Sequence, residues 1–350
     1  MNQERIRVIQ WATGAVGAEA VKIMTERSGL EVVGALVYHR EKAGRDLGEV
    51  VGLGKTLGVL TSAYPEELFS RVRADLVLHT TAANLQVNVA EIRQAIESGL
   101  HVVTVSGLSY PWRRHPRISH ELDEAAKSKG VTILGTGINP GYLLDLLPVV
   151  LSGTCAHVEK IHMQRVSEMG QYDSVPVLQS VGIGITPEEF QQRSQEGKLL
   201  LGELFVEVID MVAAALGWEL TETEVSQDPI VARKSRRAAC MEIPPGITCG
   251  VKVTLRGKIG DKTVIVLEEP MLIDIDPAED GLEYGTTLRI EGDSTLDLTL
   301  QDDICRNVAR ATAAVAVNAI SRVPAAPPGL ISMLNLPPIP PYSKIPDCRI

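Results

Sequence analysis

Short apolar runs alternate with amphipathic stretches along the first 143 residues. The apolar runs have the length of buried strands and lie at residues 5–11, 31–38, 75–81, 101–106 and 131–137. The stretches between them show helical spacing, most clearly at residues 14–27, 65–72, 88–98 and 118–129. Strands that alternate with helices in this way are typical of parallel βαβ units. The pattern predicts an α/β domain with a doubly wound parallel sheet over residues 1–143.

The pattern changes after Gly141. Strand-like segments now follow one another closely, at residues 158–168, 247–260, 262–275, 286–292 and 294–300, with a helix near 200–216. Residues 259–262 have the composition of a hairpin turn. We predict a second, α+β domain over residues 144–301 with a mixed or antiparallel sheet. Residues 302–350 are expected to form a buried helix, near 302–321, and a proline-rich strap that returns to the first domain.

Composition narrows the class of partner. The chain has 350 residues and a formal charge of −10, so neither nucleic acid nor an anionic membrane is expected as a partner. No uncharged apolar stretch approaches 18 residues, so no membrane span is expected. Five scattered cysteines without metal-ligand spacing favour reduced thiols in a cytoplasmic protein. A small molecule is the expected substrate, and no metal site is predicted.

The first strand ends in a glycine-containing turn, Ala12-Thr13-Gly14-Ala15-Val16-Gly17. In this position, before a helix, such a turn is typical of dinucleotide binding. Gly14 would let the backbone approach a pyrophosphate, and Gly17 would let helix and strand pack closely. The helix N-terminus supplies amides to the anion. A tight turn without a ligand is the structural alternative.

The end of the second strand bears on which nucleotide is bound. An acid there binds the adenosine ribose, whereas a cation accommodates a 2′-phosphate. Here the strand ends in His39 and Arg40, with no acid in the first positions. We predict NADP, with NAD as the alternative; a solvated charged loop is the structural explanation. Thr80 and Thr81 offer hydroxyls near the expected nicotinamide ribose.

Two further strand ends carry polar residues. His79, inside an apolar run, is expected to be a hydrogen-bonded core histidine. After the sixth strand, Asn139 and Pro140 fit the N-cap and first position of a helix. Asn139 would also direct its amide toward cofactor and substrate, and Pro140 would lie beside the cofactor.

The chain resembles 2,4-diaminopentanoate dehydrogenase and related NAD(P)-dependent amine dehydrogenases of the dihydrodipicolinate-reductase-like group. The resemblance rests on WATGAVG, SYPW at 109–112, GTGINPG at 135–141, GIGITPEEF at 182–190, ALGW at 215–218 and PGLISMLNLP near the C-terminus. It implies a Rossmann domain, an α+β domain that forms a homodimer interface, and a C-terminal segment that folds back. It also implies interconversion of an amine and an imine with NAD(P).

The resemblance fails at one position. It implies a catalytic glutamate just before the YPW turn, where this chain has Ser106 and Gly107. Three outcomes stay open. The base could come from Glu168, Asp173 or the Tyr110 hydroxyl. The enzyme could instead reduce a C=O, C=N or C=C bond without ammonia, or the protein could bind NADP as a sensor without turnover. Ser106 and Gly107 could also be a strand-end turn without any catalytic role.

The resemblance also places substrate contacts on the strand that carries Arg165 and Glu168. An ordinary surface ion pair is the structural alternative for these two residues. The candidate catalytic residues are thus Ser106, Tyr110 and Glu168. The candidate substrate contacts are Gly107, Tyr110, Asn139, Arg165 and Glu168. A homodimer is expected from the resemblance and because the strands of the second domain would otherwise expose a large apolar face.

Overall fold

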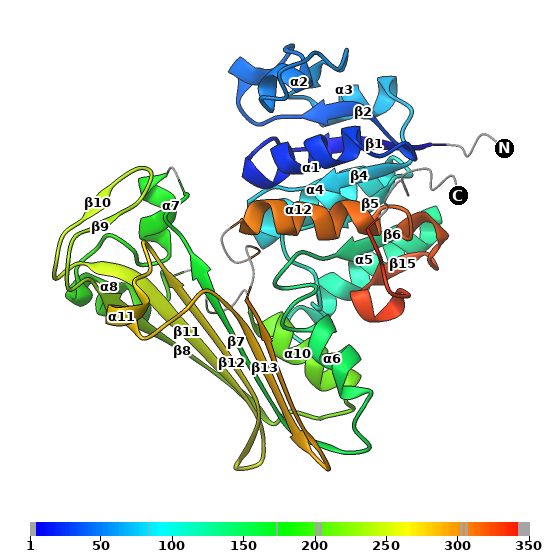
Figure 1. Cartoon of the computed structure of the whole chain (residues 1–350). Helices are drawn as coiled ribbons and strands as arrows, with labels where there is room; N and C mark the ends of the chain where they lie inside the picture. The colour runs from blue at the N-terminus through cyan, green and yellow to red at the C-terminus, as the bar shows by residue number, and fades with distance from the viewer. Residues whose placement is uncertain are drawn as a thin grey trace, which may run out of the picture. The chain divides into compact units, whose positions relative to one another are not determined.

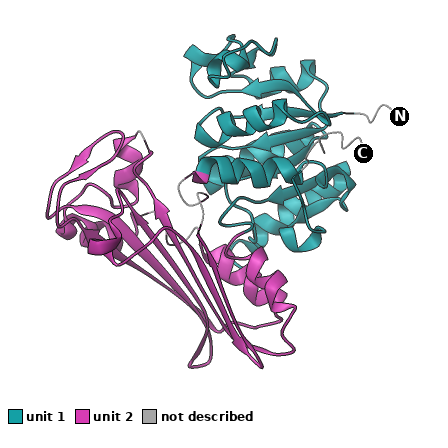
Figure 2. Ribbon diagram, in the orientation of Figure 1, with its two compact units in different colours: residues 1–142, 309–350 teal, residues 143–308 magenta. Residues whose placement is uncertain are grey.

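The computed structural model describes residues 5–82, 84–172, 174–199, 202, 205–301, 304 and 307–341. The chain divides into two compact units, one of residues 1–142 with 309–350 and one of residues 143–308 (Figure 2). Each unit is built around its own sheet.

The first unit contains a parallel sheet of seven strands in the order β15-β6-β5-β4-β1-β2-β3. The strands are β1 (Ile6–Trp11), β2 (Leu30–Leu36), β3 (Thr61–Ser62), β4 (Leu76–His79), β5 (His101–Thr104), β6 (Thr132–Gly135) and β15 (Gly329–Ile331). The central strands carry apolar residues on both faces, as expected of a sheet covered on both sides. The prediction of a doubly wound α/β domain is confirmed.

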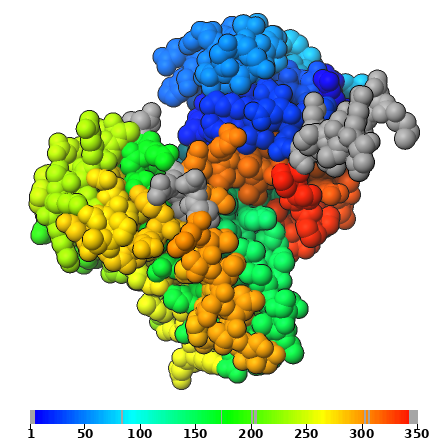
Figure 3. All heavy atoms as spheres, viewed as in Figure 1, coloured from blue at the N-terminus to red at the C-terminus, as the bar shows by residue number. Residues whose placement is uncertain are grey.

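Helices cover both faces of this sheet. The helices are α1 (Ala15–Thr25), α2 (Leu47–Val50), α3 (Pro65–Arg71), α4 (Leu85–Glu97), α5 (Pro116–Lys129) and α12 (Val308–Ala319). α3, α4 and α5 are neighbours on one face. On the other face α12 lies beside α1, with an ion pair of 2.9 Å between Arg310 and Glu19 (Figures 1 and 3).

The C-terminal segment folds back onto the first sheet, as predicted. Gly329–Ile331 pairs in parallel with Thr132–Leu134 at the edge of the sheet. The amide of Gly329 donates to the carbonyl of Val131, and the amide of Leu330 donates to Asp123 on α5. The sequence predicts a helix near residues 302–321. Residues 302, 303, 305 and 306 lie outside the described residues, and the described helix is Val308–Ala319.

The second unit contains a mixed sheet of six strands in the order β14-β13-β7-β12-β11-β8. The strands are β7 (Val158–Glu168), β8 (Glu222–Val231), β11 (Thr248–Ile259), β12 (Lys262–Leu272), β13 (Gly285–Gly292) and β14 (Thr295–Leu300). β7 and β12 are parallel, and the other neighbours are antiparallel. The predicted hairpin turn joins Ile259 to Lys262. A separate two-stranded ribbon pairs β9 (Arg236–Arg237) with β10 (Glu242–Ile243).

Short helices accompany this sheet: α6 (Leu146–Ser152), α7 (Val175–Ser180), α8 (Pro187–Gln195), α10 (Val206–Ala215) and α11 (Pro277–Asp280). α10 contacts β11 and β12, and α6 contacts β13. On the face that they cover, alternate strand residues such as Met163, Leu255 and Leu267 are fully buried. The opposite alternation places His162, Glu268 and Lys252 on the other face, joined by ion pairs. The expectation that the strands would expose a large apolar face is therefore wrong, because helices bury the apolar set.

Candidate functional site

The turn after β1 is held by buried polar side chains. Gln10 donates to the carbonyl of Ala12 at 2.8 Å and to Thr80 Oγ1 at 2.8 Å, and Thr80 Oγ1 donates to the same carbonyl at 3.2 Å. Ala12 has a φ of 72°, a conformation that favours glycine. A Cβ at Gly17 would lie 2.2 Å from the Ala12 oxygen. Gly17 therefore allows the helix to start directly against the strand end, as predicted.

The N-terminus of α1 is free to accept an anion. Gly14 is its N-cap residue and makes no side-chain capping bond, and the first turn carries no acidic residue. Gly14 and Ala15 are exposed, Thr13 and Val16 are half-buried, and a Cβ at Gly14 would have no atom within 4 Å. Backbone amides at an uncapped helix start, with the positive end of the helix dipole, suit a phosphate group. The residues fit a dinucleotide pyrophosphate.

Beyond β2 the chain presents cations to solvent. Tyr38, His39 and Arg40 are exposed, and Arg40 begins a short 3₁₀ helix, Arg40–Lys42. Arg45 is paired with Glu49 at 2.6 Å, whereas no ion pair joins Arg40 to any described residue. Arg40 is thus the guanidinium at this strand end that stays available to a ligand.

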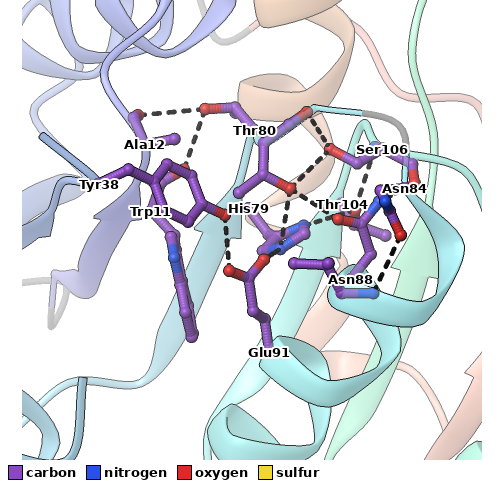
Figure 4. A network of polar contacts seen from close by, with 12 residues as sticks. Trp11, Ala12, Tyr38, His79, Thr80, Asn84, Asn88, Glu91, Thr104 and Ser106 are labelled. Carbon is purple, nitrogen blue, oxygen red and sulfur yellow. Dashed lines mark hydrogen bonds and ion pairs between the residues drawn. The ribbon is translucent and has the colours of Figure 1, made fainter. Parts of the chain in front are cut away.

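A polar network connects the ends of β4 and β5 (Figure 4). His79 is fully buried; its Nδ1 lies 2.9 Å from Thr104 Oγ1 and its Nε2 lies 2.9 Å from Glu91 Oε2. The Trp11 ring meets it edge-on at 5.7 Å. The Tyr38 hydroxyl donates to the other oxygen of Glu91 at 2.6 Å. Although the side chain as a whole is exposed, partial desolvation of its hydroxyl and the Glu91 carboxylate raise the pKa of Tyr38, which keeps this hydroxyl protonated. The expectation of a hydrogen-bonded core histidine is confirmed.

Ser106 is fixed at each of its polar atoms. Its amide donates to Thr104 Oγ1 at 3.1 Å, and its hydroxyl donates to the carbonyl of Thr81 at 2.6 Å. Its carbonyl accepts from Asn88 Nδ2 at 2.8 Å. The side chain is buried, so the turn that carries it is rigidly attached to the end of β4. Ser106 occupies the strand-end position that the sequence indicated.

The next residues reverse the chain. Gly107 and Leu108 have φ values of 94° and 65°. A Cβ at Gly107 would have no atom within 4 Å, but a Cβ at Gly135 would lie 2.1 Å from the Leu108 carbonyl oxygen. The turn therefore packs against the end of β6. Tyr110 follows it, half-buried, with its ring 4.9 Å from that of Trp112.

The segment after β6 differs from the prediction. Asn139 and Pro140, joined by a cis peptide bond, lie in a turn, and the next helix begins only at Leu146. The predicted helix start at Pro140 is wrong. Gly141, at a φ of 125°, packs against the Gly137 amide and turns the chain out of a helical path. Asp145 caps the helix instead, accepting from the Leu146 amide at 2.7 Å.

In the second unit, Arg165 is buried at 3% exposure and pairs with Glu269, which is 1% exposed, at 3.2 Å. Ser167 also donates to Glu269 at 3.1 Å. A surface pair of Arg165 with Glu168 is therefore excluded. Nε and Nη2 of Arg165 are buried without a hydrogen-bond partner among the described residues.

Glu168 holds a loop of the second unit. Its carboxylate accepts the amides of Gly170 at 2.6 Å and Asp274 at 3.0 Å, and a short hydrogen bond from the Tyr284 hydroxyl. These contacts give the side chain a structural task. A catalytic task for Glu168 stays a prediction, and Asp173 lies outside the described residues.

Several residues of the network were missed by sequence reasoning. Gln10 is a polar residue inside the apolar run IRVIQWA, which signals a buried hydrogen-bonding role. Asn88 and Glu91 are three residues apart, so they share one face of α4. The sequence shows this spacing, but it does not show which strand ends the helix face contacts. Glu269 gave no signal beyond its place in an apolar strand.

The described residues contain no group of three or more potential metal ligands. Nor does any described helix have the length and apolar character of a membrane span. Cys155, Cys240 and Cys249 are free thiols.

Residues 142–345 match the family described as 2,4-diaminopentanoate dehydrogenase C-terminal domain, and residues 7–134 match that described as dihydrodipicolinate reductase, N-terminus. The chain is 30% identical to 2,4-diaminopentanoate dehydrogenase of Acetoanaerobium sticklandii, over 95% of this chain and 94% of the relative. It is 28% identical to an amine dehydrogenase of Streptomyces virginiae, over 95% and 96%. The solved amine dehydrogenase from Mycobacterium smegmatis superposes with a TM-score of 0.84 at 26% identity, covering 96% of this chain and 97% of that one.

Proposed function

The chain belongs to the 2,4-diaminopentanoate dehydrogenase family of NAD(P)-dependent oxidoreductases, and from this premise we propose that it transfers hydride between NADP and a small substrate with a C=N, C=O or C=C bond. The observation that carries the proposal is the turn Ala12–Gly17. Its backbone is locked by Gln10 and Thr80, and it presents an uncapped helix N-terminus.

The nicotinamide cofactor supplies the hydride. The chain's own part is to bind and orient it: amides at the start of α1 receive the pyrophosphate, and Gly14 leaves room for its approach. Thr80 and Thr81 lie at the end of the neighbouring strand β4, beside this turn. The nicotinamide ribose would lie at this strand end, beside Thr80 and Thr81.

NADP rather than NAD is supported by the end of β2. His39 and Arg40 are exposed there, and Arg40 has no competing ion pair in the described chain. A guanidinium binds a 2′-phosphate through paired, charge-assisted hydrogen bonds. The ribose hydroxyls of NAD carry no charge and could not form these paired, charge-assisted hydrogen bonds with Arg40.

Reduction without ammonia is supported by the chemistry at the end of β5. Amine oxidation requires a base that removes a proton from the ammonium, and a positioned general base contributes about 10²–10⁴-fold. Ser106 carries a hydroxyl that donates to a backbone carbonyl, and Gly107 carries no side chain. A carbonyl, imine or alkene needs only one proton in addition to the hydride, which a hydroxyl can deliver.

A panel assay tests the proposal. The protein is mixed with NADPH and small ketones, aldehydes, cyclic imines and enones, each with and without ammonium, and NADPH absorbance is followed. We expect consumption that does not depend on ammonium. Consumption only with ammonium would replace the proposal by amine dehydrogenation, and tight NADPH binding without any turnover would indicate a sensor.

Amine dehydrogenation is the second candidate, favoured by the relatives of 30% and 28% identity. It requires a substitute base. Glu168 remains a candidate, although its carboxylate oxygens already accept two backbone amides and the Tyr284 hydroxyl. The Tyr110 hydroxyl is the other candidate.

We further infer a homodimer and a cytoplasmic location. The sheet face of the second unit that carries His162, Glu268 and Lys252 is polar and half-buried. A dimer on this face would therefore be held by polar contacts rather than by an apolar patch. The free thiols of the described cysteines support a reducing compartment.

A further inference from the structure

The network at the ends of β4 and β5 places a carboxylate and an imidazole behind Ser106. Glu91 Oε2 lies 2.9 Å from His79 Nε2 (Figure 4). The His79 side chain is 1% exposed, whereas that of Glu91 is 12% exposed. Glu91 thus connects a buried ring to the solvent. A buried ionisable pair of this kind does not by itself stabilise the fold. Removing the two groups from water costs free energy, and their mutual attraction offsets only part of that cost.

The Thr81 hydroxyl lies between this pair and Ser106. Its Oγ1 is 3.2 Å from His79 Nε2, 3.4 Å from Ser106 Oγ and 2.9 Å from Asn88 Oδ1. A hydroxyl rotates about one bond, so its single proton can be directed at each of these atoms in turn. The Ser106 proton is donated to the Thr81 carbonyl at 2.6 Å, and rotation about the Cβ–Oγ bond would direct it at a substrate instead.

We propose that Glu91, His79 and Thr81 form a proton relay that supplies the Ser106 hydroxyl, in place of the carboxylate that the family resemblance implies at this turn. The proposal rests on the proposed hydride transfer. It assigns substrate contact to Ser106 alone, and the other three residues act through it.

The relay balances the reduction. As hydride reaches the substrate carbon, the Ser106 O–H bond breaks and its proton forms a bond to the substrate heteroatom. Ser106 Oγ takes the proton of Thr81, and Thr81 Oγ1 takes the Nε2 proton of the His79 imidazolium. His79 becomes a neutral ring whose remaining proton, on Nδ1, is donated to Thr104. A proton from water then returns to Nε2 by way of Glu91.

Each residue type suits its task. Histidine is the side chain whose unperturbed pKa places its proton exchange near neutral pH. The titratable groups that face it are Glu91 on α4 and, through Glu91, Tyr38 after β2. The Glu91 carboxylate stabilises the imidazolium, and the Tyr38 hydroxyl occupies its second oxygen, which leaves Oε2 directed at the ring.

Nuclear magnetic resonance of the histidine rings tests the relay without any substrate. The signal of His79 is identified among the seven histidines by its loss in His79→Gln. We expect the Nδ1 proton to stay on the ring, donated to Thr104, and the Nε2 proton to exchange with water. In Glu91→Gln the exchange of the Nε2 proton should be slower, because the carboxylate that passes protons between water and the ring is gone. An Nε2 proton that exchanges equally fast in Glu91→Gln would overturn the relay.

Kinetics on a substrate from the panel provide the second test. Thr81→Val removes the hydroxyl at nearly constant shape and should lower kcat by about 10- to 100-fold. Thr81→Ser restores the hydroxyl and should recover a large part of the loss. The Kd of NADPH, measured in parallel, separates this effect from cofactor binding. Thr154→Val, which removes an exposed hydroxyl bonded only to the Leu151 carbonyl, is the matched control.

The pH profile distinguishes a relay from a structural role. The pH profile of kcat should differ between the parent and Glu91→Gln, because Glu91 returns the proton from water to the ring. If Glu91→Gln and Thr81→Val only lower the melting temperature, with kcat and its pH profile unchanged, the relay is refuted. A parent that reduces nothing on the panel would contradict the proposed function instead, and the exchange of the His79 ring proton would then decide the relay by itself.

Discussion

Replacing each of the two glycines of the turn after β1 with alanine should have a different effect: Gly17→Ala should lower stability, and Gly14→Ala should weaken NADPH binding. At Gly17 a methyl group would lie 2.2 Å from the Ala12 oxygen, 2.7 Å from Thr80 Oγ1 and 3.0 Å from Gln10 Nε2. The first of these atoms is backbone and cannot rotate away. At Gly14 the methyl group would meet no atom within 4 Å, and no positive φ opposes it.

The magnitudes follow from opposing terms. Alanine gains about 1 kcal/mol of helix propensity over glycine. At Gly17 overpacking costs about 1–3 kcal/mol, and the displaced hydrogen bonds of Gln10 and Thr80 cost about 1 kcal/mol each. The cost of the clash exceeds the gain in propensity, and Gly17→Ala should destabilise the unit by about 2–4 kcal/mol, which lowers the melting temperature by about 4–16 °C for a unit of this size.

Gly14→Ala should keep the melting temperature but bind NADPH at least about tenfold more weakly, since its methyl group would occupy the space that the pyrophosphate approaches. Differential scanning fluorimetry and NADPH fluorescence titration measure the two effects. Gly29→Ala, with no atom within 4 Å of the added carbon and far from the turn, is the control. The reasoning fails if Gly17→Ala melts with the parent, or if Gly14→Ala loses stability while keeping its affinity.

Five other outcomes are expected. Arg40→Ala should weaken NADPH more than NADH in fluorescence titration, because only NADPH has the 2′-phosphate; equal losses would contradict this. Ser106→Glu should raise ammonium-dependent turnover by up to about 10²-fold with little change in NADPH affinity. Gly107→Glu should raise ammonium-dependent turnover less than Ser106→Glu and should have a lower melting temperature, because the φ of 94° at Gly107 disfavours any side chain. Glu168→Gln places a donor against a backbone amide and should cost about 1–3 kcal/mol in chemical denaturation; loss of amination without loss of stability would identify it as the base. Light scattering should give a dimer, and a mass near 37.8 kDa would exclude it.

The sequence by itself determined the order and type of the main elements. Periodicity identified the strands and helices of the first unit and the closely spaced strands of the second, because buried strands and amphipathic helices impose different repeats on apolar residues. The role of Gly17 was also readable, since a glycine at that spacing after a strand is a local requirement.

Only the tertiary structure decided what surrounds the strand ends. The helix start expected at Pro140 moved to Leu146, because Gly141 turns the chain where local capping signals alone favoured a helix. The partner of Arg165 is Glu269, about a hundred residues away on a neighbouring strand, and not the nearby Glu168. Glu91 reaches His79 only because α4 packs on the sheet at β5, the strand next to β4. Contacts between distant segments depend on register and packing, which local periodicity does not encode.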